Sequence, residues 1–185
     1  MTKPIPMRDR ILDATAKLLV EHGTQASMSK IAGQAEVAIG SLYNHFASKE
    51  DLIRAVYERL AEEVTTLLVE GDDPAAAPEV RLERYLDNYI DFIWSDPERA
   101  ILFEYLSNVP LLPAEDVIVS FRGSSDFIGD ILQSLRDAGW LMHGDLFLMG
   151  GFIGGAIRNT LKWNRTYGRD LTVADRTQIK TMCLH

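Results

Sequence analysis

Residues 27–52 constrain the fold more than any other stretch of this 185-residue chain. They read SMSKIAGQAEVAIGSLYNHFASKEDL. Ser27 can cap a short helix from Met28 to Ala35, because a serine hydroxyl accepts a hydrogen bond from a free N–H of the first turn. Glu36 and Val37 then make a tight turn. A second short helix follows from Ala38 to about Phe46, with its apolar residues four apart on one face.

A longer helix is expected on each side of this stretch. Apolar residues recur at helical spacing from Met7 to His22, and Gly23 can end that helix in a left-handed conformation. Ser48 followed by an acid three residues later resembles a capping box. One apolar stripe then continues to about Glu70, so the helix of residues 48–70 would be roughly 30 Å long and could link two domains.

The remainder of the chain also has a helical pattern. After a break at residues 71–78, GDDPAAAP, we expect helices at 79–95, 99–108, 114–138, 145–166 and from a Thr172 cap toward Leu184. Gly123-Ser124-Ser125 can kink the long helix at 114–138. No segment alternates like a strand with hairpin signals. The sequence predicts an all-α protein of about nine helices, with a three-helix domain at residues 1–48 and a helical body at 49–185.

Two short helices across a three-residue turn, packed on a preceding helix, are a helix-turn-helix. The second helix of this motif lies in the major groove of DNA, and its N-terminal residues reach base edges. Here that helix presents short polar side chains, and Gly40 permits close approach of the backbone. The candidate DNA contacts on it are Ala38, Ile39, Gly40, Ser41, Tyr43, Asn44 and His45; those beside it are Ser27, Lys30 and Lys49.

These residue types suit contacts with a duplex. Tyr, Ser and His side chains donate to phosphate oxygens, and Asn44 can pair with adenine. Lys49 lies in the first turn of the next helix, where its ammonium would join free N–H groups at a positive dipole end. Other interpretations stay open: Tyr43 as a packing residue, His45 and Lys49 as solvated surface residues, and Ser27 as a cap as well as a contact.

The charge distribution gives weaker support. The net charge is −8, yet residues 1–49 hold six Lys or Arg against four Asp or Glu, a balance of +2, which leaves −10 on the remainder. A mildly basic head on an acidic body fits local phosphate contact. An excess this small can also arise by chance.

The segment resembles the DNA-binding domain of the TetR family of bacterial transcriptional regulators over roughly residues 8–55. The residues that carry the resemblance are Ile11-Leu12-Asp13-Ala14, Gly23, Ile31-Ala32, Gly40 to Phe46 and Ser48 to Leu52. The resemblance implies a homodimeric repressor in which one domain binds a palindromic operator and a helical domain binds a small molecule and dimerises. It also implies phosphate contacts for the positions of Tyr43, His45 and Lys49, and base proximity for Ile39, Gly40 and Asn44.

Two residues depart from the family pattern. The turn usually has Gly where this chain has Glu36, and Glu is disfavoured at positive φ, so we expect a turn of different construction. Ile39 stands where Lys, Arg or Pro is frequent. An aliphatic side chain can touch a thymine methyl but cannot hydrogen-bond guanine, so the preference at that contact should lean toward A·T.

The body of the chain is rich in aromatic residues between residues 79 and 166. Helix bundles place ligand cavities between helices, with apolar walls and a few polar groups. The effector suggested by this composition is a small molecule with substantial apolar surface. The candidate ligand-binding residues are Tyr89, Phe92, Phe103, Glu104, Phe121 and Phe127. The aromatic residues can equally be plain core, and Glu104 can point to solvent.

Gly150, Gly151, Gly154 and Gly155 lie within one helical pattern. Each glycine inside a helix costs roughly 1 kcal/mol relative to alanine, so four of them need a reason. Their spacing opens grooves for close approach of another helix. We expect this helix and the last one to form a two-fold four-helix interface in a homodimer. Room for a ligand beside the backbone is the alternative.

Other functional classes have little support in the sequence. The four His and the single Cys show no metal-binding spacing, and no nucleophile and base can be paired, so we expect no enzyme, no cofactor and no metal. The lone Cys183 and the missing signal segment favour the cytoplasm. A protein-interaction module that kept this fold but lost operator binding is the alternative function, since Glu36, Ile39 and the small +2 excess all weaken the case for DNA.

Overall fold

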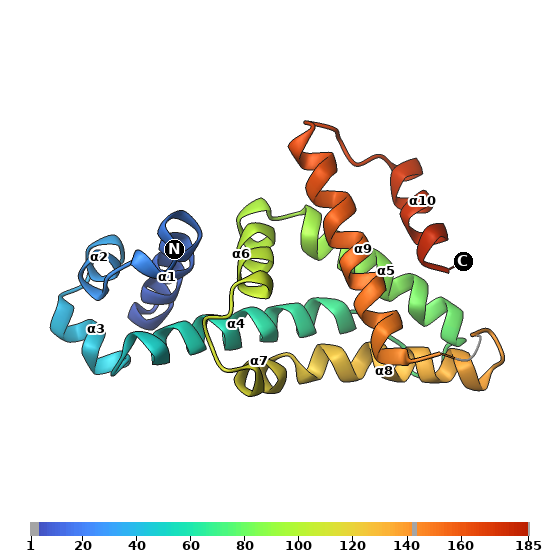
Figure 1. The fold of residues 1–185 in the computed structure, drawn as a ribbon, viewed down its shortest axis with the longest axis horizontal. Helices are drawn as coiled ribbons and strands as arrows, with labels where there is room; N and C mark the ends of the chain where they lie inside the picture. Colours follow the sequence, from blue (N-terminus) through green and yellow to red (C-terminus); the bar gives the residue numbers. More distant parts are fainter. Residues whose placement is uncertain (1–3, 142–143, 185) are drawn as a thin grey trace. The chain divides into compact units, whose positions relative to one another are not determined.

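The computed structural model describes residues 4–141 and 144–184. Within these ranges the chain forms ten α-helices and one 3₁₀ helix and no β-strand, which confirms the predicted all-α class (Figure 1). The elements in chain order are α1 (Met7–His22), η1 (Gly23–Gln25), α2 (Met28–Gln34), α3 (Ile39–His45), α4 (Lys49–Val69), α5 (Pro78–Trp94), α6 (Pro97–Asn108), α7 (Ala114–Ser120), α8 (Arg122–Asp137), α9 (Leu146–Thr166) and α10 (Val173–Leu184). Among the described residues no helix is both long enough and apolar enough to cross a membrane.

The helix expected over residues 114–138 is divided into α7 and α8. The division falls at Phe121, before the glycine at which a kink was expected. Serine hydroxyls flank it: Ser120 donates to the carbonyl of Asp116, and Ser124 donates to the carbonyl of Phe121. Such bonds offer the backbone an alternative to the helical ladder. Gly123 has a packing role instead, because a Cβ there would lie 3.1 Å from the Thr65 side chain.

The chain clusters into two compact units that do not follow sequence order. Unit 1 comprises Met1–Glu62 and Glu98–Ser120, and unit 2 comprises Glu63–Pro97 and Phe121–His185. Helix α4 contributes residues to both. The division between residues 1–48 and 49–185 remains a prediction about the extent of the DNA-binding module.

In unit 1, the first three helices enclose a small apolar core. Its members include Ile11, Leu12 and Leu19 of α1, Ile31 of α2 and Leu42 of α3, and each is at most 1% exposed. Helix α4 is then fixed to its neighbours by polar contacts. Its buried Tyr57 donates to the carbonyl of Leu106 at 2.9 Å, Arg54 pairs with Asp116 at 2.9 Å and Arg59 pairs with Asp13 at 2.7 Å.

In unit 2, α5 packs against α8, α9 and α10. It is buried on more than one side, because Leu86 and Ile90 share one face and Phe92 points away from it, and each is at most 1% exposed. Helix α10 is held to α5 by Lys180, which pairs with Asp87 at 2.9 Å, and by Arg176, which pairs with Asp91. Thr172 caps α10 as expected, because its hydroxyl accepts from the N–H of Asp175.

Candidate functional site

The turn between α2 and α3 sets the direction in which α3 leaves the core. Val37 donates its N–H to the carbonyl of Ala32 at 3.0 Å, and Glu36 donates to the carbonyl of Gly33 at 3.2 Å. This pair of bonds defines a Schellman motif, which requires positive φ at its turning residue. Glu36 has φ 54°, and it is the one non-glycine residue with positive φ among those described.

The expectation that Glu36 would impose a different turn is therefore wrong. Gly139 and Gly168 close α8 and α9 with the same two bonds, at φ 78° and 64°. The left-handed region costs a side-chain-bearing residue energy but does not exclude it. At Glu36 a third bond compensates, because Arg10 donates from a guanidinium Nη to the Glu36 carbonyl at 3.0 Å.

Helix α3 exposes the side chains that were predicted to face DNA. Leu42 is fully buried and Phe46 nearly so, whereas Tyr43 is 50% and Ile39 42% exposed. Gly40, Asn44 and His45 are also exposed, and Ser41 is half-buried. A Cβ built on Gly40 would meet nothing within 4 Å, so its backbone is open to close approach. Ala38 is the N-cap residue of α3 and does not belong to its first turn.

Three flanking residues lie at helix starts. Ser27 acts as the N-cap of α2, since its hydroxyl accepts from the N–H of Lys30 at 3.2 Å, and the side chains of both residues are exposed. Lys49 begins α4 but is only half-exposed. Its ammonium donates to the carbonyl of Thr24 at 2.5 Å, which fixes it beside η1. An ammonium has three donors, so two remain for a phosphate oxygen.

The start of α4 is capped much as the sequence predicted. The hydroxyl of Ser48 accepts from the N–H of Asp51 at 3.0 Å and donates to the carboxylate of the same residue at 2.8 Å. The shorter Asp side chain thus binds the serine hydroxyl, where a capping box would bind the serine N–H. The cap holds Lys49 at a defined place in the first turn.

Arg8 and Arg10 are the residues of this surface that the sequence did not single out. The guanidinium of Arg8 lies 5.5 Å from the centre of the Phe46 ring, a cation–π distance at the end of α3. Arg10 reaches across 26 residues of sequence to the turn. No short sequence pattern predicts either contact, because each joins α1 to a residue that is distant in the sequence.

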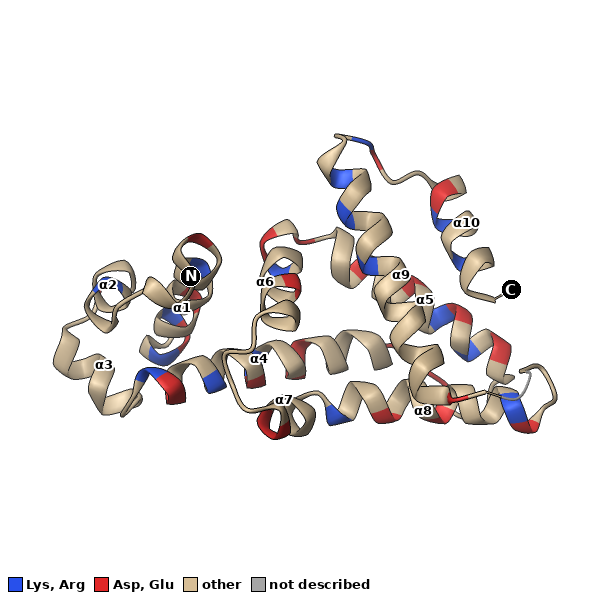
Figure 2. Ribbon diagram, in the orientation of Figure 1, with Lys and Arg blue, Asp and Glu red and all other residues tan. Residues whose placement is uncertain are grey.

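The charge around α3 comes entirely from its neighbours. Figure 2 shows that α3 itself carries no Lys, Arg, Asp or Glu; its one basic residue is His45 in the last turn. Arg8 of α1 lies over Phe46 at the end of α3, and Lys30 of α2 and Lys49 of α4 add positive charge on the neighbouring helices. Phosphate attraction therefore falls to the flanks, while hydroxyl, amide and imidazole groups on α3 remain for orientation and base contact.

In unit 2, the predicted ligand-binding residues are largely core. Tyr89 and Phe92 are buried, and Phe121 and Phe127 are half-buried. Tyr85 and Tyr89 form a tilted ring pair, and burial strongly raises the pKa of Tyr85. The hydroxyl of Tyr89 accepts from Arg158 of α9 at 2.8 Å. The other two candidates belong to unit 1, where Phe103 is buried and Glu104 is half-buried.

The four glycines of α9 divide into two pairs. A Cβ on Gly150 would contact Ile128 and Leu132 of α8, and one on Gly154 would lie 3.1 Å from the Tyr89 hydroxyl of α5. These two glycines pack against other helices of the same chain, and their assignment to a dimer interface stays a prediction. Gly151 and Gly155 face open space, and the exposed side of α9 that they share also carries Phe147, Leu148 and Phe152.

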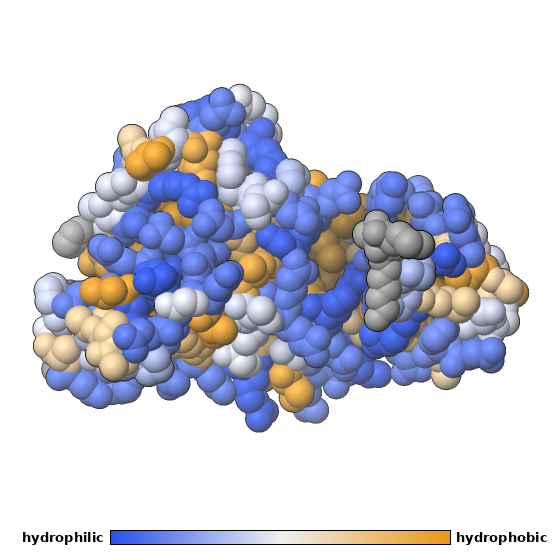
Figure 3. Space-filling model, turned by 180° about the vertical axis from the view of Figure 1, so that it is seen from behind, coloured by the Kyte–Doolittle hydropathy of each residue, from blue (hydrophilic) through white to orange (hydrophobic). Residues whose placement is uncertain are grey.

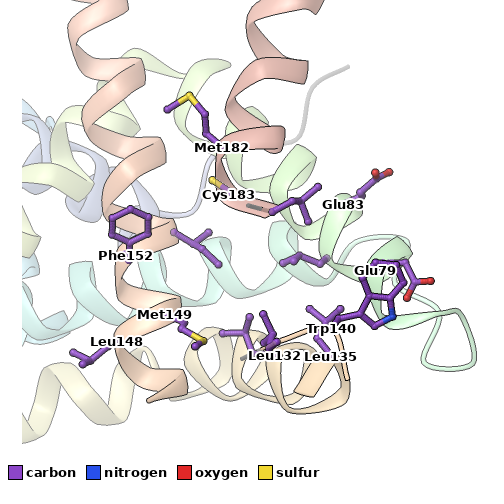
Figure 4. A pocket seen from close by; sticks show the side chains of 14 residues that line it. Glu79, Glu83, Leu132, Leu135, Trp140, Leu148, Met149, Phe152, Met182 and Cys183 are labelled. Atoms are coloured by element: carbon purple, nitrogen blue, oxygen red, sulfur yellow. The ribbon is translucent and has the colours of Figure 1, made fainter. Parts of the chain in front are cut away.

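A cavity of about 800 Å³ lies within unit 2, between α5, α8, α9 and α10 (Figure 4). Its walls are mainly Leu, Ile, Met and aromatic side chains, and none of the six predicted ligand-binding residues lines it. Glu79 and Glu83 of α5 and Cys183 of α10 add polar groups. Burial raises the pKa of the Cys183 thiol, so the neutral thiol is favoured. Large hydrophobic side chains also reach the molecular surface in several separate areas (Figure 3).

The geometry of α1, α2 and α3 defines a class of protein. The short helix α3 follows α1 and α2 in one small unit. Its apolar side is buried and its polar side is exposed, and neighbouring helices carry cationic side chains. This is the arrangement of a helix-turn-helix that places its second helix in the major groove. The fold and site are those of a DNA-binding transcriptional regulator.

Comparison with known proteins gives the family. Residues 11–56, about a quarter of the chain, match the family model described as "Bacterial regulatory proteins, tetR family". Over 178 residues the chain is 25% identical to the HTH-type transcriptional activator FasR of Mycolicibacterium smegmatis, covering 92% of this chain and 80% of that protein. Residues 11–56 therefore carry the DNA-binding domain of the TetR family of bacterial regulators.

Solved structures agree on the fold. A TetR-family transcription regulator from Shewanella sp. PV-4 has a TM-score of 0.88 at 19% identity, covering 97% of this chain and 96% of that one. The regulator FadR from Bacillus subtilis, solved in complex with stearoyl-CoA, has a TM-score of 0.78 at 24% identity, covering 95% and 97%. Both likenesses extend over the helical body as well as the DNA-binding helices.

Proposed function

We propose that this regulator is a homodimeric repressor that binds a palindromic operator and responds to a small molecule. The observation that supports DNA binding most directly is the exposed polar side of α3, which lies over a buried apolar side in a helix-turn-helix. Tyr43, half-exposed on that side with no core role, carries the argument best. As a DNA-binding protein of a bacterial family, it would act in the cytoplasm.

We assign the contacts of α3 by chemistry. Tyr43 and His45 donate to phosphate oxygens, and Asn44 pairs with a base edge in the groove. Ile39 touches a thymine methyl, while Ala38, Gly40 and Ser41 allow the backbone to come close. Ser27, Lys30 and Lys49 bind phosphates beside the groove, from the starts of α2 and α4.

Alanine variants separate this function from a protein-interaction role on the same fold. Tyr43→Ala and Lys49→Ala should each weaken binding to palindromic DNA from the chain's own promoter region by roughly 1–3 kcal/mol. Glu70→Gln, on an exposed residue of unit 2, is the control and should bind like the parent. If both alanine variants bind DNA as the parent does, the assignment of DNA contacts to Tyr43 and Lys49 is contradicted. The protein-interaction role would then be favoured.

The dimer is proposed on the exposed side of α9, with α10 beside it. Phe147, Leu148 and Phe152 are 82%, 67% and 71% exposed, and Val173 and Met182 of α10 are 81% and 62% exposed. Such apolar exposure marks an interaction surface. Gly151 and Gly155 leave room for a partner helix between these side chains. A two-fold axis would pair the surface with itself and set the spacing of two DNA-binding heads.

Sedimentation tests the dimer. Phe152→Glu should shift the protein from dimer to monomer, because a charge would be buried in an apolar interface. The matched control is Val80→Glu, which alters a residue of α5 that is 49% exposed and should leave the dimer intact. A variant Phe152→Glu that remains dimeric would place the interface elsewhere.

The effector is proposed to be a molecule with a long or broad apolar part. FadR from Bacillus subtilis binds stearoyl-CoA, and the aromatic body of this chain could accept an apolar ligand in a comparable fold. Tyr89, Phe92, Phe121 and Phe127 in unit 2, and Phe103 and Glu104 in unit 1, remain the residues proposed for it. The similar protein FasR is a transcriptional activator. Repression by the present chain is therefore a separate proposal. Deleting this chain should raise expression from its operator if it is a repressor.

A further inference from the structure

The peptide group between Glu36 and Val37 is held at both of its polar ends. Its N–H, which belongs to Val37, donates to the carbonyl of Ala32 in α2 at 3.0 Å. Its carbonyl, which belongs to Glu36, accepts from a guanidinium Nη of Arg10 in α1 at 3.0 Å. A change in φ or ψ of Glu36 rotates this peptide plane and breaks these bonds. Two different helices therefore fix one peptide group.

This peptide group lies directly before the helix that is proposed to enter the major groove. Only Val37 and Ala38 separate Glu36 from Ile39, the first residue of α3. Ala38 is the N-cap residue, and its carbonyl accepts the N–H of Leu42 at 3.1 Å. The orientation of the held peptide plane thus sets the direction in which α3 leaves α2. Contacts with base edges need side chains held within about 0.5 Å of their place, so a small rotation at this point matters.

Two turns with the same pair of backbone bonds lack the side-chain contact. Gly139 and Gly168 adopt positive φ after α8 and α9. Within the described ranges no side chain donates to the carbonyl of either glycine. Glycine populates positive φ about as readily as negative φ, whereas a residue with a Cβ does not. The side-chain donor accompanies the turn at Glu36, where the residue needs it.

The guanidinium of Arg10 is committed to this contact. Arg10 is half-buried, and its Nε is buried without a hydrogen-bond partner among the residues that the structure describes. In the same part of the chain the guanidinium has no carboxylate partner, and the exposed carboxylate of Glu36 does not bind it. Leaving a buried N–H unpaired costs free energy. The bond to the Glu36 carbonyl offsets that cost, so Arg10 acts on the backbone of the turn and not on its side chain.

We propose that Arg10 is a positioning residue for operator binding. It holds the peptide group of Glu36 and Val37 in the conformation that lets α3 enter the major groove, and it does not itself contact DNA. The inference rests on the proposed DNA binding and names a residue of α1 on which that binding depends. Without Arg10, Glu36 relaxes toward negative φ, α3 changes direction, and a smaller fraction of the DNA-binding heads is competent.

The salt dependence of operator binding separates positioning from direct contact. Loss of a positioning residue changes the fraction of competent heads and leaves the bound complex unaltered, so Arg10→Met and the parent should lose affinity along parallel lines as salt rises. A charged donor shifts a local equilibrium by about tenfold or more, so Arg10→Met should bind about tenfold more weakly at each salt concentration. Lys17→Met removes an exposed cation of the same helix and should bind like the parent. A slope lowered by about one per head would identify Arg10 as a phosphate contact and refute the proposal.

Substitutions at position 36 provide the matched comparison. In a Glu36→Gly background, Arg10→Met should cost about threefold or less, because glycine keeps positive φ without help. In a Glu36→Ala background, which loses the same carboxylate but keeps a Cβ, the loss should remain about tenfold. Equal losses in the two backgrounds would contradict the coupling. If Arg10→Met alone does not fold, the variant that combines it with Glu36→Gly should still fold and bind like Glu36→Gly, and its failure would contradict the coupling equally.

Amide hydrogen exchange of Val37 tests the same contact without DNA. Its N–H belongs to the held peptide group, so Arg10→Met should speed its exchange several-fold in the parent and Glu36→Ala backgrounds and leave it unchanged with Glu36→Gly. A parent protein that binds no duplex would overturn the proposed function, and the exchange of Val37 would then decide whether Arg10 holds the turn. Parent-like operator binding by Arg10→Met, or unchanged exchange of Val37, would overturn this inference while leaving the proposed function standing.

Discussion

Replacing Glu36 by glycine should stabilise unit 1, although it removes an exposed side chain. Glu36 turns the chain between α2 and α3 at φ 54°. A residue with a Cβ loses roughly 1–2 kcal/mol in the left-handed region. Glycine escapes that cost but loses about 0.5–1 kcal/mol more backbone entropy on folding. The difference predicts a gain of about 0.5–1 kcal/mol for Glu36→Gly.

The contacts of the turn support this estimate. The two Schellman bonds and the bond from Arg10 all use backbone atoms of residues 32–37, so glycine keeps every one of them. Thermal unfolding followed by circular dichroism should therefore show a rise of about 1–4 °C, given the usual relation between free energy and Tm for a chain of this length.

Two controls isolate the backbone effect. Glu36→Ala removes the same charge but keeps the strain, so it should not raise Tm. Gly168→Ala imposes the strain at φ 64° on the corresponding turn after α9, where a Cβ would meet nothing within 4 Å, and should cost about 1 kcal/mol. If Glu36→Gly melts no higher than Glu36→Ala, the reasoning about strain in this turn is refuted.

Three further predictions concern packing and titration. Tyr57→Phe should destabilise the protein by about 1–2 kcal/mol in urea unfolding, because it leaves the Leu106 carbonyl without its 2.9 Å donor; an unchanged midpoint would show that the bond contributes nothing. Gly154→Ala should cost about 1–3 kcal/mol, since its Cβ would lie 3.1 Å from the Tyr89 hydroxyl, whereas Gly129→Ala in open space on α8 should gain up to about 1 kcal/mol. Hydrogen bonds from Thr172 lower the pKa of Asp175 below its usual value, so the contribution of that carboxylate to stability is present above the unfolded pKa and is lost as pH falls through the folded pKa. Thr172→Val should raise the pKa of Asp175 in a carboxylate NMR titration, and an unshifted titration would contradict that cause.

The sequence predicted those features whose causes are local. The caps at Ser27, Ser48 and Thr172 lie within three residues of the N–H groups that they bind, so a short pattern specifies each one. The buried side of α3 likewise follows from Leu42 and Phe46 at helical spacing. The polar residues left on its other side were therefore correctly expected to be exposed.

Features that depend on distant neighbours escaped prediction. The turn at Glu36 tolerates positive φ with the help of Arg10, and no pattern in the sequence connects two residues so far apart. The glycines of α9 divide into inward and outward pairs only because α5 and α8 cover one side of that helix. The cavity of unit 2 depends in the same way on four helices, which is why aromatic content alone did not point to its lining.

The central claim is that α3 and its flanking cations bind operator DNA, and the salt dependence of that binding tests it most directly. Affinity for a palindromic duplex from the chain's own promoter region is measured across a series of salt concentrations, for the parent protein and for Lys49→Ala. The account predicts a steep loss of affinity with salt, and a slope smaller by about two in the variant, one for each head of the dimer. Affinity that does not change with salt, or that is no greater than for a scrambled duplex of equal length, would contradict it.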